Sequence, residues 1–507
     1  MIPSHLQSVA FLGVDAQLVE VEADAKKGEK GQSHFVIVGL PDTAVKESKD
    51  RVLAALKNSG FALDSLQCTI NLAPADLKKE GALYDLPIAL ALLLTHGKLT
   101  SSISSSFLYA GELSLAGQMR PMRGALSAAL LAKRLGKRGI LLPKQNAGEA
   151  AAVTGIEVIG VENLKEAAHF LENPASIKPA LFSHSSPQNE ERAPSVDFSE
   201  IKGQLTAKRA LEVAASGGHN LLLFGPPGTG KTLMSKALSG ILPPLSLDET
   251  LEITKIHSLA GLLPNGTSLV RERPFRNPHH TISAIGLVGG GKVPRPGELS
   301  LAHLGVLFLD ELPEFSRHTL EVLRQPLENG QVMITRSNIT LTFPTSCLFV
   351  AAMNPCPCGY AGHPQKACKD TQTQIDRYRS KISGPLLDRI DMHVEVPHVP
   401  FLDLSSTQKT ETSLEVRARV IRARSVQQKR FGWAKTNAQM TPSQVTRFCT
   451  LDSEGQSLIR QAMDKMGLSA RAYTRILKLS RTIADMESSP SITPDHLMEA
   501  LGFRSLI

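Results

Sequence analysis

The most informative segment of the chain reads Asn220-Leu221-Leu222-Leu223-Phe224-Gly225-Pro226-Pro227-Gly228-Thr229-Gly230-Lys231-Thr232. Its apolar start predicts a short buried strand, and the glycine-rich part has the spacing G-x-x-x-x-G-K-T ahead of a predicted helix. Glycines allow backbone N–H groups to approach phosphates closely, and a helix N-terminus adds its positive dipole end. We therefore expect a phosphate-binding loop in which Lys231 reaches the β- and γ-phosphates and the Thr232 hydroxyl ligates Mg²⁺.

A second apolar run, Val306–Leu309, ends in the acidic pair Asp310-Glu311. Such a pair alone often only solvates the end of a strand. About eighty residues after a phosphate-binding loop it predicts the Walker B motif, with Asp310 holding Mg²⁺ and Glu311 orienting the attacking water. The two motifs together predict an ATPase that uses Mg-ATP.

The overall composition is that of a globular protein of about three domains. The chain has 507 residues, of which 42% are hydrophobic and 21% are charged. No apolar run approaches the ~18 residues of a membrane span, and the N-terminus does not look like a signal peptide. Six cysteines in a chain of this length do not make a disulfide scaffold. We expect a cytoplasmic protein without a membrane partner.

The positive charge is unevenly distributed. Residues 1–197 contain 20 Lys and Arg against 21 Asp and Glu, whereas the remainder contains 36 against 27. A basic half of a protein indicates a polyanionic partner, most often nucleic acid, but it can equally serve solubility.

The pattern of strands and helices predicts an α/β chain with four regions. An α+β N-terminal domain comes first and is followed by a linker rich in Pro, Ser and Asn. The core then alternates strands and helices, which predicts a mostly parallel sheet. The last region is helical. The expected bounds are 1–172 for the first domain, 173–197 for the linker, 198–400 for the core and 401–507 for the helical domain. Expected elements include a strand at Phe35–Val38, a helix at Asp42–Ser59, a strand at Thr69–Leu72, and helices at Glu415–Arg430 and Ala470–Met486.

Five further segments carry a resemblance to a known family. They are Val38-Gly39-Leu40-Pro41-Asp42, Asn71-Leu72-Ala73-Pro74-Ala75-Asp76, Arg276-Asn277-Pro278-His279-His280, Ala351-Ala352-Met353-Asn354-Pro355-Cys356-Pro357-Cys358 and Ser383-Gly384-Pro385-Leu386-Leu387-Asp388-Arg389-Ile390-Asp391. With the two nucleotide motifs, the chain resembles the magnesium-chelatase-like AAA+ ATPases of the ComM/YifB family over nearly its whole length.

The resemblance implies roles for three more residues. Asn354 matches sensor 1, which hydrogen-bonds the γ-phosphate or the attacking water. Arg389 matches an arginine finger that reaches a neighbour's ATP, and Arg471 matches sensor 2. Spacing alone would favour surface salt bridges for both arginines. A finger acting in trans implies an oligomer, by analogy a hexameric ring.

The resemblance also implies a ribosomal-S5/Lon-protease-like fold for the N-terminal domain. The segment Lys79-Glu80-Gly81-Ala82-Leu83-Tyr84-Asp85 lies where Lon-type proteases carry their nucleophilic serine. Leu83 or a close neighbour takes that position, so peptide-bond attack has no nucleophile. We expect a ring scaffold or a platform for partners.

Two segments are candidates for DNA contact. Gln331–Thr335 and Ile339–Phe343 predict a β-hairpin with Arg336 at its tip. The glycine-rich stretch Gly286–Gly297, with Lys292, resembles the helix-2 insertion of the family, a pore loop, or else is a disordered surface loop. The basic residues of Glu415–Arg430 form no single stripe, which favours a solvated helix face over a DNA reader.

Three cysteines, Cys356, Cys358 and Cys368, lie close together in the sequence. Thiolates suit Zn²⁺, with His363 or Asp370 as the fourth ligand. The alternative is a loop that only retains its cysteines.

These observations lead to one expected function and its rivals. We expect an ATP-driven motor acting on single-stranded or branched DNA, as a helicase or in branch migration during recombination or natural transformation. The rivals are a chelatase-type ATPase and a protein-remodelling ATPase that act through a protein partner without DNA.

Overall fold

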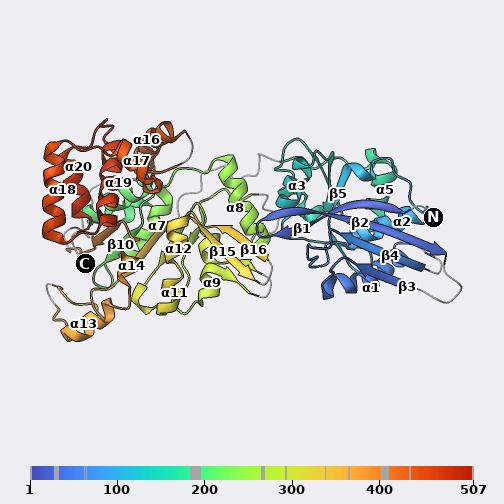
Figure 1. Ribbon diagram of the computed structural model, residues 1–507, viewed down its shortest axis with the longest axis horizontal. Coiled ribbons are helices and arrows are strands. Elements are labelled where there is room, and N and C mark those ends of the chain that lie inside the picture. Colours follow the sequence, from blue (N-terminus) through green and yellow to red (C-terminus); the bar gives the residue numbers. More distant parts are fainter. Residues whose placement is uncertain are drawn as a thin grey trace. The chain divides into compact units, whose positions relative to one another are not determined.

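The computed structural model describes residues 3–27, 34–61, 63, 66–182, 196–263, 269–291, 294–336, 339–363, 366–400, 403, 410–432 and 435–504. The chain forms two compact units, one of residues 1–189 with 247–271 and one of residues 190–246 with 272–507. We call them the first unit and the second unit. Figure 1 labels their elements.

A four-stranded sheet organises the first half of the first unit. Its order is β1-β2-β4-β3, with β3 parallel to β4 and the other neighbours antiparallel. The strands are β1 (Ser4–Leu12), β2 (Asp15–Lys27), β3 (His34–Val38) and β4 (Leu66–Ala73), and the helices are α1 (Thr43–Asn58) and α2 (Asp85–Thr95). Alternate residues of β2, such as Val19 and Val21, are fully buried, which is the period of a strand with one face on the core. The predicted strands at Phe35–Val38 and Thr69–Leu72 and the predicted helix at Asp42–Ser59 are confirmed within a few residues.

The second half of the first unit is built on three parallel strands in the order β5-β8-β9. Its elements are β5 (Phe107–Tyr109), β6 (Glu112–Leu113), β7 (Met119–Arg120), α3 (Ala125–Arg134), β8 (Gly139–Pro143), α4 (Lys144–Ala150), β9 (Glu157–Val161) and α5 (Leu164–Glu172). Helix α8 (Leu247–Ala260) joins this unit although it follows the phosphate loop in sequence. The Ser258 hydroxyl accepts a 2.8 Å hydrogen bond from the N–H of Gly124 at the start of α3.

Five parallel strands form the sheet of the second unit, in the order β11-β14-β17-β10-β18. They are β10 (Leu221–Phe224), β11 (Phe275–Arg276), β14 (Val306–Leu309), β17 (Leu348–Met353) and β18 (Met392–Glu395). The expected α/β class with a parallel sheet is confirmed. Parallel strands end at the same edge, so the residues that follow β10, β14 and β17 meet there.

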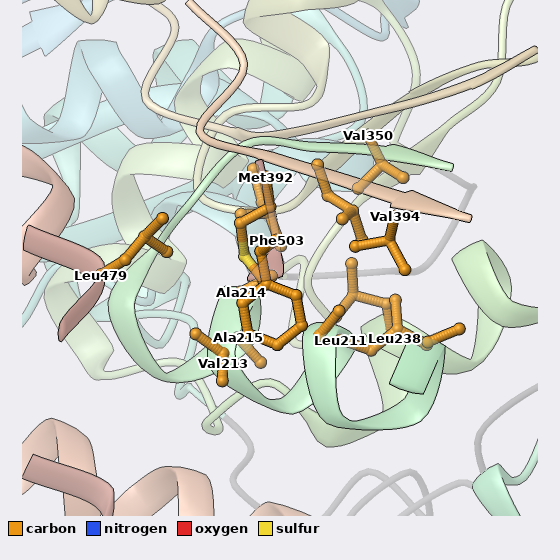
Figure 2. Close-up of a cluster of buried hydrophobic side chains, with 14 of the residues drawn as sticks. Leu211, Val213, Ala214, Ala215, Leu238, Val350, Met392, Val394, Leu479 and Phe503 are labelled. Atoms are coloured by element: carbon orange, nitrogen blue, oxygen red, sulfur yellow. The ribbon is translucent and has the colours of Figure 1, made fainter. Parts of the chain in front are cut away.

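Helices and two hairpins surround this sheet. They are α6 (Leu205–Gly217), α7 (Lys231–Ile241), α9 (Ala284–Val288), the hairpin β12 (Gly289–Gly290) and β13 (Arg295–Pro296), α10 (Glu298–Leu301), α11 (Arg317–Glu321), α12 (Arg324–Asn329), the hairpin β15 (Gln331–Arg336) and β16 (Ile339–Pro344), α13 (Gln372–Arg379) and α14 (Gly384–Leu387). Figure 2 shows how the core closes on one face of the sheet, where Phe503 lies beside Ala214 of α6 and Met392 of β18.

The end of the chain is helical, as expected. The helices are α16 (Ser413–Phe431), α17 (Pro442–Phe448), α18 (Ser453–Met466), α19 (Ala470–Met486) and α20 (Pro494–Gly502), and they gather in one group in Figure 1. Thr412 and Glu415 form a capping box at the start of α16, and Ser469 caps α19. Among the described residues, no helix combines the length and the apolar character needed to cross a membrane.

Candidate active site

The predicted phosphate loop connects the end of β10 to the start of α7. Lys231 is 8% exposed, and its Nζ donates hydrogen bonds to the carbonyl oxygens of Gly225 (2.7 Å) and Pro226 (2.8 Å). Gly228 and Gly230 have φ angles of +79° and +87°, and no atom lies within 4 Å of a Cβ placed on either. The left-handed backbone requires glycine at both positions. The open space beside them leaves room for a ligand above the loop.

Burial changes the acidity of the lysine. Desolvation lowers the pKa of Lys231 to about 8, and the charge of Asp310 opposes part of this shift. The ammonium group is held by neutral carbonyl oxygens, with Asp310 as the nearby carboxylate. An added anion would therefore find an under-compensated cation in the loop.

Asp310 and Glu311 follow β14, which is two strands from β10 in the sheet. The Thr232 hydroxyl donates a 2.7 Å hydrogen bond to Asp310 Oδ2, although the two residues are far apart in sequence. Glu311 has a φ of +52°, an uncommon value for a residue with a Cβ, and its side chain is 57% exposed. The hydroxyl and the carboxylate thus share one point, and the second carboxylate is free to face solvent.

The residue predicted as sensor 1 also reaches the loop. Asn354 follows β17, and its Oδ1 accepts a 3.3 Å hydrogen bond from Lys231 Nζ. Tyr378 of α13 lies against the backbone of Asn354, and burial raises the pKa of Tyr378 to about 12. The structure thus brings together four of the predicted residues, Lys231, Thr232, Asp310 and Asn354.

Sequence reasoning assigned no role to His280, which approaches the candidate catalytic glutamate. His280 Nδ1 lies 3.7 Å from Glu311 Oε2, and its ring packs on His279 with centroids 4.1 Å apart. The same segment is fixed by Arg276, whose guanidinium donates two hydrogen bonds to Glu298, of 2.6 and 2.8 Å. The segment Arg276–His280 stood out in the sequence, but the proximity of His280 to Glu311 became evident only from the structure.

The two remaining predicted residues are Arg389 and Arg471. The Arg389 guanidinium donates to the carbonyl oxygens of Arg324 (2.8 Å) and Pro385 (2.7 Å) and to the carboxylate of Glu328, which belong to α12 and α14. Arg471 is exposed in the first turn of α19. Neither arginine makes a described hydrogen bond or ion pair with the loop of its own chain.

The candidate DNA segments are described in part. The predicted hairpin is present as β15 and β16, and β15 runs one residue further than expected, so that Arg336 pairs with Ile339. Val332 and Phe343 are buried on one face, whereas Met333 is 57% exposed on the other. Lys292 and the side chain of Arg336 lie outside the described residues.

Four arginines of the basic helix α16 contact other parts of the second unit. Arg417 donates to Gly240 O, Arg424 to Ala215 O, and Arg419 and Arg430 bind carboxylates of the same unit. These contacts correct the expectation of a solvated helix face, since four of its arginines bind other parts of the second unit.

The three cysteines of the cluster lie close to one another and to one carboxylate. The Sγ atoms of Cys356, Cys358 and Cys368 lie 3.4 to 3.6 Å from one another. A carboxylate oxygen of Asp370 belongs to the same group of ligand atoms, all within 4.8 Å. His363 accepts a 3.1 Å hydrogen bond from the N–H of Lys366 and is not part of that group.

A cavity of about 860 Å³ lies beside the end of β18 and the residues that follow it. Its lining includes Lys202, Gln204, Lys208 and His398. A Cβ placed on Gly225 would lie 2.1 Å from Val396 O, so the phosphate loop abuts the segment that lines this cavity.

Comparisons with known proteins agree with this geometry. Three family models match: "Magnesium chelatase, subunit ChlI" over residues 197–404, "Subunit ChlI of Mg-chelatase" over 21–146 and "Magnesium chelatase, subunit ChlI C-terminal" over 410–504. The competence protein ComM of Haemophilus influenzae is 43% identical across 99% of this chain and 97% of its own length. The uncharacterized protein YifB of Escherichia coli is 44% identical over the same shares. The magnesium-chelatase 38 kDa subunit of Rhodobacter capsulatus is 26% identical across 32% of this chain and 51% of its own length. The chain therefore belongs to the magnesium-chelatase-like family of AAA+ ATPases that includes ComM and YifB.

Proposed function

We propose that this protein is an ATP-driven motor that acts on DNA as a ring of identical subunits. The observation that carries the ATPase part is the meeting of Lys231, Thr232, Asp310 and Asn354 at one edge of the parallel sheet. The family uses ATP with Mg²⁺. The Thr232 hydroxyl and the Asp310 carboxylate are the oxygen ligands that Mg²⁺ prefers.

Each residue then has one task. Lys231 binds the β- and γ-phosphates, and the N–H groups of the Gly225–Thr232 loop hold their oxygens. Thr232 and Asp310 hold Mg²⁺, which when bound neutralises charge on the phosphate oxygens. Glu311 orients a water molecule and accepts its proton, and Asn354 fixes the same water or the γ-phosphate. The cavity lined by Lys202 and His398 takes the base and ribose of the nucleotide.

The assembly follows from the arginines. Arg389 is bound to α12 and α14 of its own chain, and Arg471 is exposed at the start of α19. We propose that Arg389 stabilises the transition state in a neighbouring subunit and that Arg471 acts as sensor 2. Such a site is complete only in an oligomer, which by family analogy is a hexamer.

Four assignments of chain regions belong to the same proposal. Residues 1–172 form a ribosomal-S5/Lon-like domain without a catalytic serine, joined by a linker at 173–197 to the core at 198–400, and residues 401–507 form the helical lid. Leu83, which is partly buried, offers no serine hydroxyl for attack on a peptide bond, so the first domain serves as a scaffold or a platform for partners. Six free cysteines fit a reducing compartment, the cytoplasm.

We also propose a structural Zn²⁺ on Cys356, Cys358, Cys368 and Asp370. A tetrahedral zinc with Zn–S bonds of about 2.3 Å requires sulfur atoms about 3.8 Å apart. The separations of 3.4 to 3.6 Å between the sulfur atoms are close to this value. The ion would hold this loop, which lies directly after Asn354, in one shape.

DNA as the substrate rests on charge and on a relative. Residues 198–507 carry the whole positive excess of the chain. ComM of Haemophilus influenzae is named a competence protein, which fits helicase or branch-migration work on incoming DNA. We propose Lys292 and Arg336 as contacts to the phosphate backbone of single-stranded or branched DNA.

The test measures ATP hydrolysis with and without single-stranded, duplex and forked DNA. A DNA motor should be stimulated, and its binding should weaken with salt by about 0.7 log units per log unit for each single-strand phosphate contact. Arg336→Ala and Lys292→Ala should reduce this slope, while Arg422→Ala on α16 serves as a charge-matched control. If no DNA changes the rate of ATP hydrolysis at low salt and no binding is detected, the chelatase-type or protein-remodelling alternative is favoured.

A further inference from the structure

A largely buried carboxylate lies where three parts of the second unit meet. Asp391 immediately precedes β18, and its side chain is 13% exposed. Asp391 Oδ2 accepts a 3.1 Å hydrogen bond from the N–H of Asn220 and lies 3.4 Å from His219 Nδ1. Asp391 Oδ1 lies 3.2 Å from Arg475 Nη1 on α19. One side chain therefore joins the start of β10, the start of β18 and α19.

The same junction touches the backbone of the candidate arginine finger. Asn220 Nδ2 donates a 3.1 Å hydrogen bond to Arg389 O, and Asn220 O accepts from the N–H groups of Asp391 and Met392, both at 3.0 Å. Arg389 precedes Asp391 by two residues. The position of the finger segment thus depends on contacts with the strand that leads into the phosphate loop.

The other arginine is reached through α19. Arg471 and Arg475 are four residues apart, so they lie one above the other on one face of the helix. Arg471 is exposed, and no ion pair of the described residues fixes it. Arg475 is therefore the polar attachment of α19 nearest to Arg471.

Charge makes this attachment depend on Asp391. Burial by itself would raise the pKa of Asp391, but His219 and Arg475 outweigh it and hold the pKa at about 2, so the carboxylate is ionised at neutral pH. Arg475 Nη1 has no hydrogen-bond acceptor of suitable geometry among the described residues. Removing the carboxylate leaves this buried guanidinium N–H without its counter-charge, which favours movement of the side chain toward water.

We propose that Asp391 is a positioning residue for both arginines of the ATP site, holding Arg471 through Arg475 and Arg389 through its own backbone. The inference rests on the roles given to these arginines in the proposed function. It adds that the carboxylate of Asp391 sets the tilt of α19 through Arg475, whereas the backbone of the same residue holds the finger segment through Asn220. Loss of the ion pair then misplaces groups that act on the phosphates, without removing any of them.

The experiment compares steady-state ATP hydrolysis of full-length variants under saturating Mg²⁺. Arg475→Met should lower kcat by about 10²-fold, the usual scale for misplacing a catalytic group by about 1 Å, with a smaller change in KM. Arg475→Lys keeps the charge and should recover most of kcat. Arg471→Ala combined with Arg475→Met should be no slower than Arg471→Ala alone, because both changes remove the same contribution. Asp391→Asn should behave as Arg475→Met does.

A matched control separates positioning from stability. Arg430→Met breaks a second ion pair that anchors α19, between Arg430 and Asp485, and does not involve Asp391. It should lower the melting temperature and leave kcat near the wild-type value. If Asp391→Asn does not fold, Arg475→Met and Arg475→Lys still decide the matter.

The outcomes are distinct. If Arg471→Ala slows hydrolysis but folded Arg475→Met does not, the positioning role is wrong and the proposed function stands. If the losses in kcat of Arg471→Ala and Arg475→Met multiply in the double variant, the two residues act independently and the positioning role is also wrong. If Arg471→Ala leaves kcat and KM unchanged, the sensor 2 assignment fails and this inference fails with it.

Discussion

Replacing His393 tests how the second unit responds to acid. His393 lies on β18 with 6% of its surface exposed, and its Nε2 has no hydrogen-bond partner among the described residues. Burial, followed by the charge of Arg504, lowers the pKa of His393 from its ordinary value of 6.5 to about 4. The folded protein therefore keeps this imidazole neutral at a pH where the unfolded chain protonates it.

The sign and size follow from proton binding. Between pH 6.5 and pH 4 the unfolded state binds more protons at this site, so stability falls as the pH falls through this window. Above pH 6.5 the imidazole is neutral in both the folded and the unfolded state, so this part of the stability is retained in full. One pKa unit corresponds to about 1.4 kcal/mol, so the full shift costs about 3 kcal/mol of unfolding free energy by pH 4.

The assay is urea unfolding of wild type and His393→Gln at pH 7.5 and pH 4.5. Glutamine does not titrate, so the variant should lose about 2–3 kcal/mol less than wild type between the two values. Other acidic and histidine groups contribute equally to both proteins and cancel in the difference. Arg504→Met should give an intermediate result, because it removes the charge that disfavours protonation. Equal losses in wild type and His393→Gln would refute the reasoning.

Three further outcomes are expected from the proposed site. Lys231→Ala should abolish productive ATP binding in a nucleotide-binding titration, because the phosphates lose their main cation, whereas Glu311→Gln should bind ATP and not hydrolyse it; normal turnover by the latter would show that the catalytic glutamate is misassigned. Arg389→Ala should retain nucleotide binding but lose about 10³–10⁵ in rate, and mixing it with Glu311→Gln subunits should restore part of the activity; absence of rescue at every mixing ratio would argue against action in trans. Freshly reduced protein should carry up to about one zinc per chain by elemental analysis, lost in a Cys356→Ser/Cys358→Ser double variant; protein free of zinc would leave the cysteines without a metal role.

Much of the local structure follows from the sequence. The phosphate loop, the Asp310-Glu311 pair and the C-terminal helices are recognisable because their residues are contiguous or recur at helical spacing, so short-range geometry suffices. The hairpin of β15 and β16 was predicted for the same reason, from alternation around a short turn.

Other features depend on contacts between segments that are far apart in the sequence. Helix α8 and the residues up to Arg271 belong to the first unit although they lie between the two nucleotide motifs. The choice of Asp370 over His363 beside the three cysteines depended on the path of one loop. Spacing in the sequence carries no information on either, because it does not say which surfaces pack together.

The motifs in the sequence predict which residues hold phosphate and Mg²⁺, and in which order strand, loop and helix present them. The contacts that those residues make follow only from the tertiary fold. The parallel sheet places the ends of β10, β14 and β17 at one edge, which brings Thr232 to Asp310 and Lys231 to Asn354. The same folding buries Asp391 between His219 and Arg475, because packing helices against a sheet brings together charges that are far apart in the chain.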